Sequence, residues 1–141
     1  MRFFVHKNTF STLKAEQCSS CVETHLPLGY HGHMGRTVVS GRFEWDEQKA
    51  KLNVKKHKIS FEAILPMLND PMFIEDFDEE NSTSDESRFR TIGQINGFAI
   101  VASCYTHRNG RIRIINARRA TPKERHYYEQ RCDIMRDFFT P

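Results

Sequence analysis

The 141-residue sequence contains no apolar run near the ~20 residues that a membrane-spanning helix needs. Its first ten residues, MRFFVHKNTF, lack the apolar segment of a secretory signal peptide. The four cysteines are unevenly spaced and follow no export signal, which favours reduced thiols over a disulfide framework. We therefore expect a cytoplasmic protein that does not bind a membrane.

Several motifs of well-known enzyme classes are also missing. The sequence has no glycine-rich phosphate loop and no Asp-x-Asp-x-Asp-Gly order of the kind that binds calcium. Ser103 and Cys104 lie inside an apolar run, so no nucleophilic triad is evident. We therefore expect no cofactor and a reaction that needs no metal.

The first 33 residues show neither a helical nor a strand period. They contain Cys18 and Cys21 at metal-ligand spacing, and the histidines that follow could complete a tetrahedral zinc site: His25, His31 and His33. Two alternatives are an unstructured extension and a start codon chosen too far upstream, because Met34 directly precedes the patterned region. We favour these two over zinc and expect one folded domain over residues 34–141.

Charge is strongly segregated along the chain, although the net charge is only +3. Residues 70–86 carry eight acids and no base. Residues 88–136 carry eleven bases, ten of them arginine, against three acids, which gives a net charge of +8. Because arginine forms planar, bidentate contacts to phosphate and carboxylate, this half of the chain favours a polyanion or an acidic partner.

Local signals predict two helices after a first strand over residues 37–45. Asp46 is a good N-cap, and the residues that follow place Ala50, Asn53, Val54 and His57 on one helical face. We expect the polar members of that face, Asn53 and His57, to tie the two helices together. Ser60 is a second N-cap, and Pro66 should shorten or kink the helix that it starts because proline lacks an amide donor.

The second half of the chain reads as a meander of strands. A short strand over residues 72–77 precedes an acidic loop that we expect to be solvated, and two Asn-Gly pairs separate runs at 88–95, 98–107 and 111–117. Thr121-Pro122-Lys123-Glu124 is a capping box that opens a last helix, whose buried side is expected to hold Tyr128, Cys132, Met135 and Phe139. The predicted order is β-α-α-β-β-β-β-α, an α+β fold with a mostly antiparallel sheet.

Four segments carry a resemblance to a known family. They are FEWDEQKAKLNVKKHKISFEAI at 43–64, DP at 70–71, ESRFRTIG at 86–93 and RIRIINARRATPKERHYYE at 111–129. Together they resemble the BrnT family of bacterial toxins over residues 43–130. Two positions depart from the family: Lys58 stands where glycine is usual after the Lys-His pair, and Pro66 stands where a helix-favouring residue is usual.

The resemblance implies a RelE-like fold and an RNA-cleaving toxin that inhibits translation, with the RNA cut either free or on the ribosome. It also implies a BrnA-like antitoxin that neutralises the toxin, in a toxin-antitoxin complex that binds operator DNA. A non-catalytic module that binds nucleic acid or an acidic partner through the same basic face is the alternative.

Five residues form the predicted catalytic set: Arg88, Arg113, Arg118, Arg119 and Glu86. Arginine stays charged, so it suits phosphate binding and transition-state stabilisation better than proton transfer. Arg118 and Arg119 also precede a helix N-terminus, whose amides favour phosphate. The opposing interpretation is that Arg88 simply pairs with Glu86 and that strand arginines face solvent.

Four further residues are predicted to bind RNA: Arg108, Arg111, Lys123 and Trp45. Trp45 could stack on a base, although a tryptophan at the end of a strand is more often a core anchor. The candidate proton carriers are His107, Glu86, His57 and Tyr128.

Overall fold

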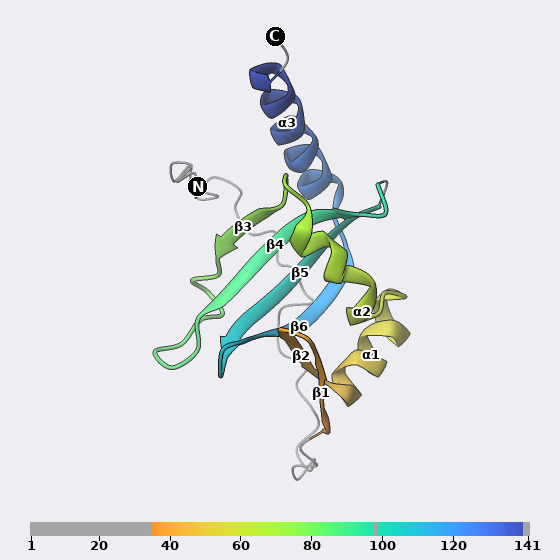
Figure 1. Cartoon of the computed structure of the whole chain (residues 1–141), viewed down its shortest axis with the longest axis vertical. Coiled ribbons are helices and arrows are strands. Elements are labelled where there is room, and N and C mark those ends of the chain that lie inside the picture. Colours follow the sequence, from red (N-terminus) through yellow and green to blue (C-terminus); the bar gives the residue numbers. More distant parts are fainter. Residues whose placement is uncertain (1–34, 98, 140–141) are drawn as a thin grey trace. The chain divides into compact units, whose positions relative to one another are not determined.

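The computed structural model describes residues 35–97 and 99–139 (Figure 1). The zinc ligands considered at Cys18, Cys21, His25, His31 and His33 lie outside the described residues. Within the described ranges, no helix is both long enough and apolar enough to cross a membrane.

The fold is built on a six-stranded sheet with the order β1-β2-β6-β5-β4-β3. The strands are β1 (Thr37–Ser40), β2 (Phe43–Asp46), β3 (Ile74–Phe77), β4 (Arg88–Ile95), β5 (Ala99–Arg108) and β6 (Arg111–Arg119). Neighbouring strands are antiparallel except β2 and β6, which are parallel. The predicted α+β class and mostly antiparallel sheet are therefore confirmed.

Turn chemistry explains both the successes and the error in the strand prediction. Asn96-Gly97 and Asn109-Gly110 adopt positive φ at both positions, as tight hairpins between antiparallel strands require. The single strand predicted over residues 37–45 is wrong, because Gly41 adopts a φ of 58° and folds β1 back onto β2. The element order therefore begins with a hairpin.

Two N-caps start the helices that follow this hairpin. The Asp46 carboxylate accepts a 2.9 Å hydrogen bond from the Lys49 amide at the start of α1 (Glu47–His57). The Ser60 hydroxyl accepts from the Ala63 amide at the start of α2 (Phe61–Ile64). The chain then tightens into the 3₁₀ helix η2 (Leu65–Asn69), which confirms the expected effect of Pro66.

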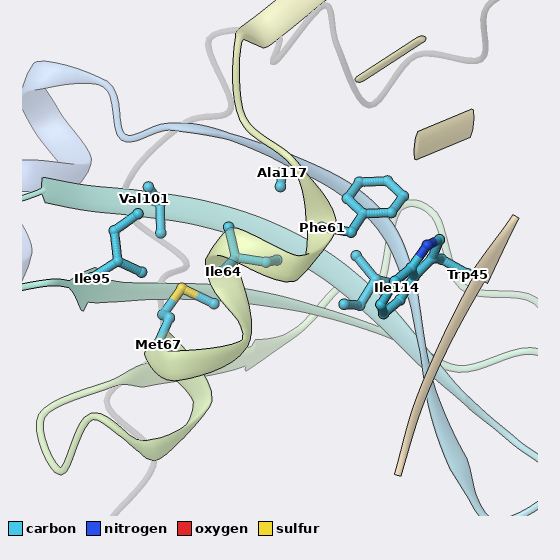
Figure 2. Close-up of a cluster of buried hydrophobic side chains, with 8 residues drawn as sticks. All are labelled: Trp45, Phe61, Ile64, Met67, Ile95, Val101, Ile114 and Ala117. Atoms are coloured by element: carbon cyan, nitrogen blue, oxygen red, sulfur yellow. The ribbon is translucent and has the colours of Figure 1, made fainter. Parts of the chain in front are cut away.

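Apolar side chains from α2, η2 and the sheet form the main core on one face of the sheet (Figure 2). Trp45 and Phe61 meet edge to face, with ring centroids 6.2 Å apart. The cluster consists of Trp45, Phe61, Ile64, Met67, Ile95, Val101, Ile114 and Ala117. We call this side of the sheet the helix face.

Asn53 joins α1 to the segment that leads into α2 and to the sheet. Its side-chain amide donates 2.8 Å hydrogen bonds to the carbonyls of Ile59 and Ala117, and its oxygen accepts from the Ala117 amide. The expected link is confirmed for Asn53, and for His57 it stays a prediction. Asn53 also bonds to Ala117 at the edge of β6, beyond the point where β2 ends. These two residues are 64 positions apart, so no local sequence pattern predicts the contact.

The last helix, α3 (Pro122–Phe139), begins at the predicted capping box. The Glu124 carboxylate accepts from the Thr121 amide at 2.8 Å, and the Glu124 amide donates to the Thr121 hydroxyl at 3.3 Å. Of the residues expected on its buried side, Tyr128 is 3% exposed, whereas Cys132 and Met135 are half-buried. The Tyr128 hydroxyl donates to Asp70, which fixes the helix against the loop before β3.

Candidate nucleic-acid interface

Strand register decides which arginines share a surface. Side chains at paired positions of neighbouring strands point to the same side of a sheet. Thr106 on β5 pairs with Arg88 on β4 and with Arg113 on β6, so these two arginines flank one threonine on the side opposite the helix face. Arg108 and Arg111 pair with each other two residues further along, on the same side. We call this side the arginine face.

A β-bulge in β6 adds Arg118 to the arginine face. Cys104 pairs with Asn116 and Tyr105 pairs with Ile114, which leaves Ile115 as the extra residue. Without the bulge, Arg113 and Arg118 would point to opposite sides of the sheet, because they are five residues apart. The same shift sends Arg119, which pairs with the core residue Val101, to the helix face. The structure therefore separates Arg118 from Arg119, which were predicted to act together.

Arg113 is bound to a buried carboxylate. Its guanidinium lies 3.1 Å from the Glu44 carboxylate, and the two side chains are 19% and 8% exposed. The pair links β6 to its parallel neighbour β2. A buried carboxylate left without this partner would be strongly unfavourable, so Arg113 has a structural role that the sequence did not reveal.

Arg118 is likewise held by a carboxylate. Two of its nitrogens donate to the two oxygens of Glu124 at 2.7 and 2.8 Å, in a bidentate contact. Burial alone would raise the pKa of Glu124, but hydrogen bonds from Arg118 and Thr121 overcome it and hold the pKa below its ordinary value. The capping box was predicted, whereas this use of its glutamate to clamp β6 to α3 was not.

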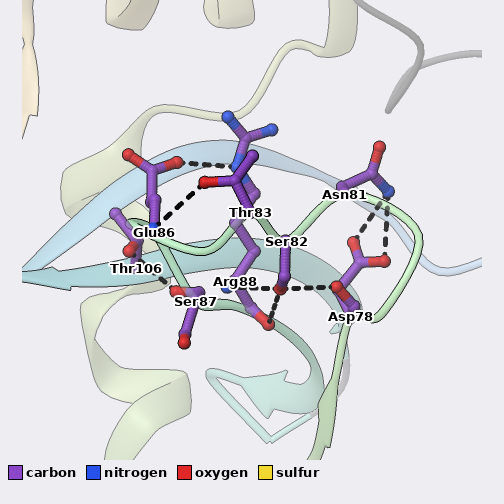
Figure 3. A network of polar contacts seen from close by, with 8 residues as sticks. All are labelled: Asp78, Asn81, Ser82, Thr83, Glu86, Ser87, Arg88 and Thr106. Atoms are coloured by element: carbon purple, nitrogen blue, oxygen red, sulfur yellow. Dashed lines mark hydrogen bonds and ion pairs between the residues drawn. The ribbon is translucent and has the colours of Figure 1, made fainter.

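Arg88 forms the most accessible of these pairs (Figure 3). Its Nε donates to Glu86 at 2.8 Å, and the side chains are 34% and 42% exposed. Figure 3 shows the two terminal nitrogens of Arg88 pointing away from the loop that carries Glu86. The expected pairing of Arg88 with Glu86 is therefore present, and it leaves one edge of the guanidinium directed outward.

The loop that carries Glu86 is held by its own polar side chains. The Ser82 hydroxyl donates to the Asp78 carbonyl at 2.6 Å and accepts from the Arg88 amide at 2.9 Å. Asp78 is 1% exposed, accepts two hydrogen bonds from Asn81 and lies 3.8 Å from Arg90. The expectation of a merely solvated loop is therefore wrong for Asp78, and Glu86 is presented on a fixed turn.

The remaining predicted RNA-binding residues differ in exposure. Arg108 and Arg111 are exposed at the tip of the β5–β6 hairpin and form no ion pair with the described residues. Lys123 is exposed in the first turn of α3. Trp45 is 1% exposed and packs against Phe61, so its prediction as a stacking residue is wrong and its core-anchor interpretation holds.

The candidate proton carriers have different surroundings. Burial, followed by the charges of Lys56 and Arg118, lowers the pKa of the half-buried His57. Burial and the hydrogen bond to Asp70 raise the pKa of Tyr128, which suits a structural donor rather than a base. His107 is exposed at the end of β5, on the helix face. The described residues contain no group of three or more histidines, cysteines and carboxylates that could hold a metal ion.

Comparison with known proteins identifies the family. The family model described as "Ribonuclease toxin, BrnT, of type II toxin-antitoxin system" matches residues 45–124, which is more than half of the chain. The 1.1 Å crystal structure of the Brucella abortus ribonuclease toxin BrnT is similar with a TM-score of 0.43 and 24% identity, over 55% of this chain and 92% of that one. No curated protein matches. On the family match, this chain belongs to the BrnT family of type II toxin-antitoxin ribonuclease toxins.

Proposed function

We propose that this protein is a metal-independent endoribonuclease toxin whose cleavage site lies where β4 begins, at the Glu86–Arg88 pair. The observation that carries the proposal is the half-exposed carboxylate–guanidinium pair beside two exposed arginines on one face of the sheet. Arg108 lies two residues from Thr106, the partner of Arg88, so it is a diagonal neighbour within reach of a long side chain.

This geometry suits RNA cleavage by attack of the 2′ oxygen on its own phosphate. The reaction forms a 2′,3′-cyclic phosphate and breaks the bond from phosphorus to the 5′ oxygen, which takes a proton from water and leaves as a 5′ hydroxyl. It needs a base for the 2′ hydroxyl and cations for the negative charge that develops on the phosphate oxygens. Glu86 supplies the carboxylate base, and the outward edge of Arg88 faces the phosphate. Arg108 and Arg111 hold the next phosphate, whereas Arg113 and Arg118 position the strands that carry the site.

A role in a toxin-antitoxin system follows from the family. The protein cleaves cytoplasmic RNA, on or off the ribosome, and thereby inhibits translation. A BrnA-like antitoxin covers the arginine face, and the toxin-antitoxin complex binds operator DNA. The order of elements after the first hairpin supports a RelE-like fold.

A non-catalytic binding module is the second candidate. It is favoured by the carboxylate partners of Arg88, Arg113 and Arg118, because each pair offsets a positive charge that a phosphate would need. Such a protein retains RNA or an acidic partner without cutting RNA.

Glu86→Gln separates the two candidates. The amide keeps an oxygen that can accept from Arg88 but cannot take a proton, so the cleavage rate should fall by about 10²- to 10⁴-fold. The full chain is incubated with labelled RNA and a metal chelator, and new 5′-hydroxyl ends are counted. Glu79→Gln, an exposed acid of the same loop, is the matched control and should cleave normally.

Two results would contradict the proposal. Equal cleavage by the Glu86→Gln and Glu79→Gln proteins would remove Glu86 as the base. Retention of RNA by the unaltered protein, without any new ends, would favour the binding module. Expression of the full chain in bacteria gives a separate readout, because the toxin should arrest growth and Glu86→Gln should relieve the arrest.

A further inference from the structure

Three adjacent strands place aromatic rings side by side on the helix face, at the end opposite the main core. Phe89 on β4 stacks on Tyr105 of β5, with centroids 5.4 Å apart and 23° between the ring planes. Phe77 of β3 and His107 of β5 each meet Phe89 edge to face, at 5.8 and 5.5 Å. We call Phe77, Phe89, Tyr105 and His107 the aromatic strip.

The strip lies where the helices do not cover the sheet. Along β4 and β5, the cross-strand pair of Phe89 and Tyr105 lies nearer to the β5–β6 turn than the pairs that contain the core residues Val101 and Ile95. Figure 1 shows β4 and β5 running beyond α2 and η2 toward the β3–β4 loop and the β5–β6 turn. Phe77 is 48% exposed, His107 is exposed, and Phe89 between them is half-buried.

One interpretation of cross-strand aromatic pairs is that they simply stabilise the sheet. The 5% exposure of Tyr105 agrees with this structural role. The exposed rings of Phe77 and His107 agree less well with a purely structural role. Phe77 and His107 lie on either side of Phe89 and keep exposed surface that no described helix covers. Exposed rings on a sheet are the arrangement with which several RNA-binding modules stack bases.

Positive charge borders one side of the strip. His107 pairs with Ile112, and Ile112 pairs with Phe43 of β2, so Phe43 continues the same row. The guanidinium of Arg42 lies 5.1 Å from the Phe43 ring centroid. Arg108 and Arg111 stand at the hairpin tip next to His107. The side chains of both point to the arginine face, so on the strip's own face the positive border is formed by Arg42.

Negative charge borders the strip on its β3 side, so a bound polyanion would have a preferred orientation. The Tyr105 hydroxyl donates to the exposed Glu75 of β3, and burial together with this hydrogen bond raises the pKa of Tyr105. The acidic loop 78–87 follows β3 at the same end of the sheet. A polyanion is therefore attracted to the β6 side of the strip and repelled from the β3 side.

We propose that the aromatic strip binds single-stranded RNA by stacking two unpaired bases, one on Phe77 and one on His107, while the RNA backbone continues from the His107 side to Arg42 and over the hairpin tip to Arg108 and Arg111. The ligand class rests on the proposed function, and the strip adds a binding surface on the face opposite Glu86 and Arg88. The tip of the β5–β6 hairpin is where the two surfaces meet, because Arg108 and Arg111 there point to the arginine face while the neighbouring His107 points to the strip. Glu75 can accept a hydrogen bond from the amino group of a stacked base.

Phe77→Leu tests the stacking, because it keeps an apolar side chain at an exposed position and removes the ring. The probe is a short single-stranded oligonucleotide with 2′-O-methyl groups, which cannot be cleaved by attack of the 2′ oxygen. A 2-aminopurine base within it reports stacking through quenched fluorescence. The full chain carrying Phe77→Leu should bind the probe about fivefold or more weakly and quench it less.

Two matched variants separate stacking from charge and from general destabilisation. Leu52→Ala alters an apolar residue of α1 that is 60% exposed, and it should leave binding and quenching unchanged. Arg111→Ala should weaken binding and reduce the slope of log affinity against log salt by about 1, whereas Phe77→Leu should leave that slope unchanged.

The outcomes distinguish this proposal from the ribonuclease proposal. Equal binding and quenching by the Phe77→Leu and unaltered proteins would overturn the strip, as would failure of the unaltered protein to bind the probe. Loss of stacking in Phe77→Leu supports the strip even if no cleavage is detected, in which case only the ribonuclease proposal fails.

Discussion

Two ends of the arginine face use the same residue type in opposite ways. In the interior rows, Arg113 and Arg118 are mostly buried, and each is bonded to a carboxylate from another element. At the hairpin tip, Arg108 and Arg111 are exposed and have no ion-pair partner among the described residues. The first pair therefore stabilises the fold, and the second is available to a ligand.

Replacing Arg113 should produce the largest effect on stability. Arg113→Ala leaves the Glu44 carboxylate buried without its partner, which should lower the free energy of unfolding by about 3 kcal/mol. Urea denaturation measures this loss. The double variant Arg113→Met with Glu44→Met should recover most of it, because no charge is then buried alone. A stability equal to that of the unaltered protein in Arg113→Ala would contradict the structural role.

Acid should weaken the contact at Arg118. Because the folded pKa of Glu124 lies below its unfolded value of about 4.3, the stability that it contributes is fully present above that pH. This contribution is lost as the pH falls through the lower folded pKa. Unfolding measured between pH 3 and 6 should show this loss, and Glu124→Gln should remove that part of the pH dependence. The hypothesis fails if both proteins respond equally to acid.

Lys58→Gly should stabilise the protein by about 1 kcal/mol, because Lys58 holds a left-handed conformation with a φ of 60° after α1. Thermal unfolding measures the gain, and Lys56→Gly inside the helix is a control that should destabilise instead. A Lys58→Gly protein that unfolds earlier than the unaltered chain would show that the Lys58 side chain matters more than its backbone strain. The stabilised background also allows Arg113→Ala to be studied folded.

The hairpin tip should show the smallest effect on stability. Arg111→Ala removes an exposed side chain, so the free energy of unfolding should change by no more than about 0.5 kcal/mol. The same variant should bind RNA more weakly, as measured by titration at several salt concentrations. A large loss of stability in Arg111→Ala would erase the distinction between the two ends of the arginine face.

Local chemistry determined which parts of the fold could be predicted. The caps at Asp46, Ser60 and Thr121 and the turns at Asn96-Gly97 and Asn109-Gly110 act within a few residues, so the helix starts and the hairpins follow from the sequence. The turn at Gly41 was missed, because one glycine between β-forming residues is a weaker signal than an Asn-Gly pair.

The candidate site depended on features that no local pattern reveals. Alternation alone sends Arg118 and Arg119 to opposite sides of the sheet, but the bulge at Ile115 decides that Arg118, and not Arg119, shares the side of Arg113. The partner of Arg113 lies 69 positions away at Glu44. The aromatic strip also depended on register, because a two-residue Asn-Gly turn at 96–97 would pair Phe89 with Cys104, whereas Ile95 pairs with Ala99 and the register is one residue further.

The contact between Asn53 and β6 also affects how the sheet can grow. An uncovered strand offers its peptide groups to any extended chain that meets it. Beyond the end of β2, the amide side chain of Asn53 already occupies both peptide groups of Ala117. A foreign strand that approached β6 there would first have to displace a helix, so one asparagine protects this border against unwanted polymerisation.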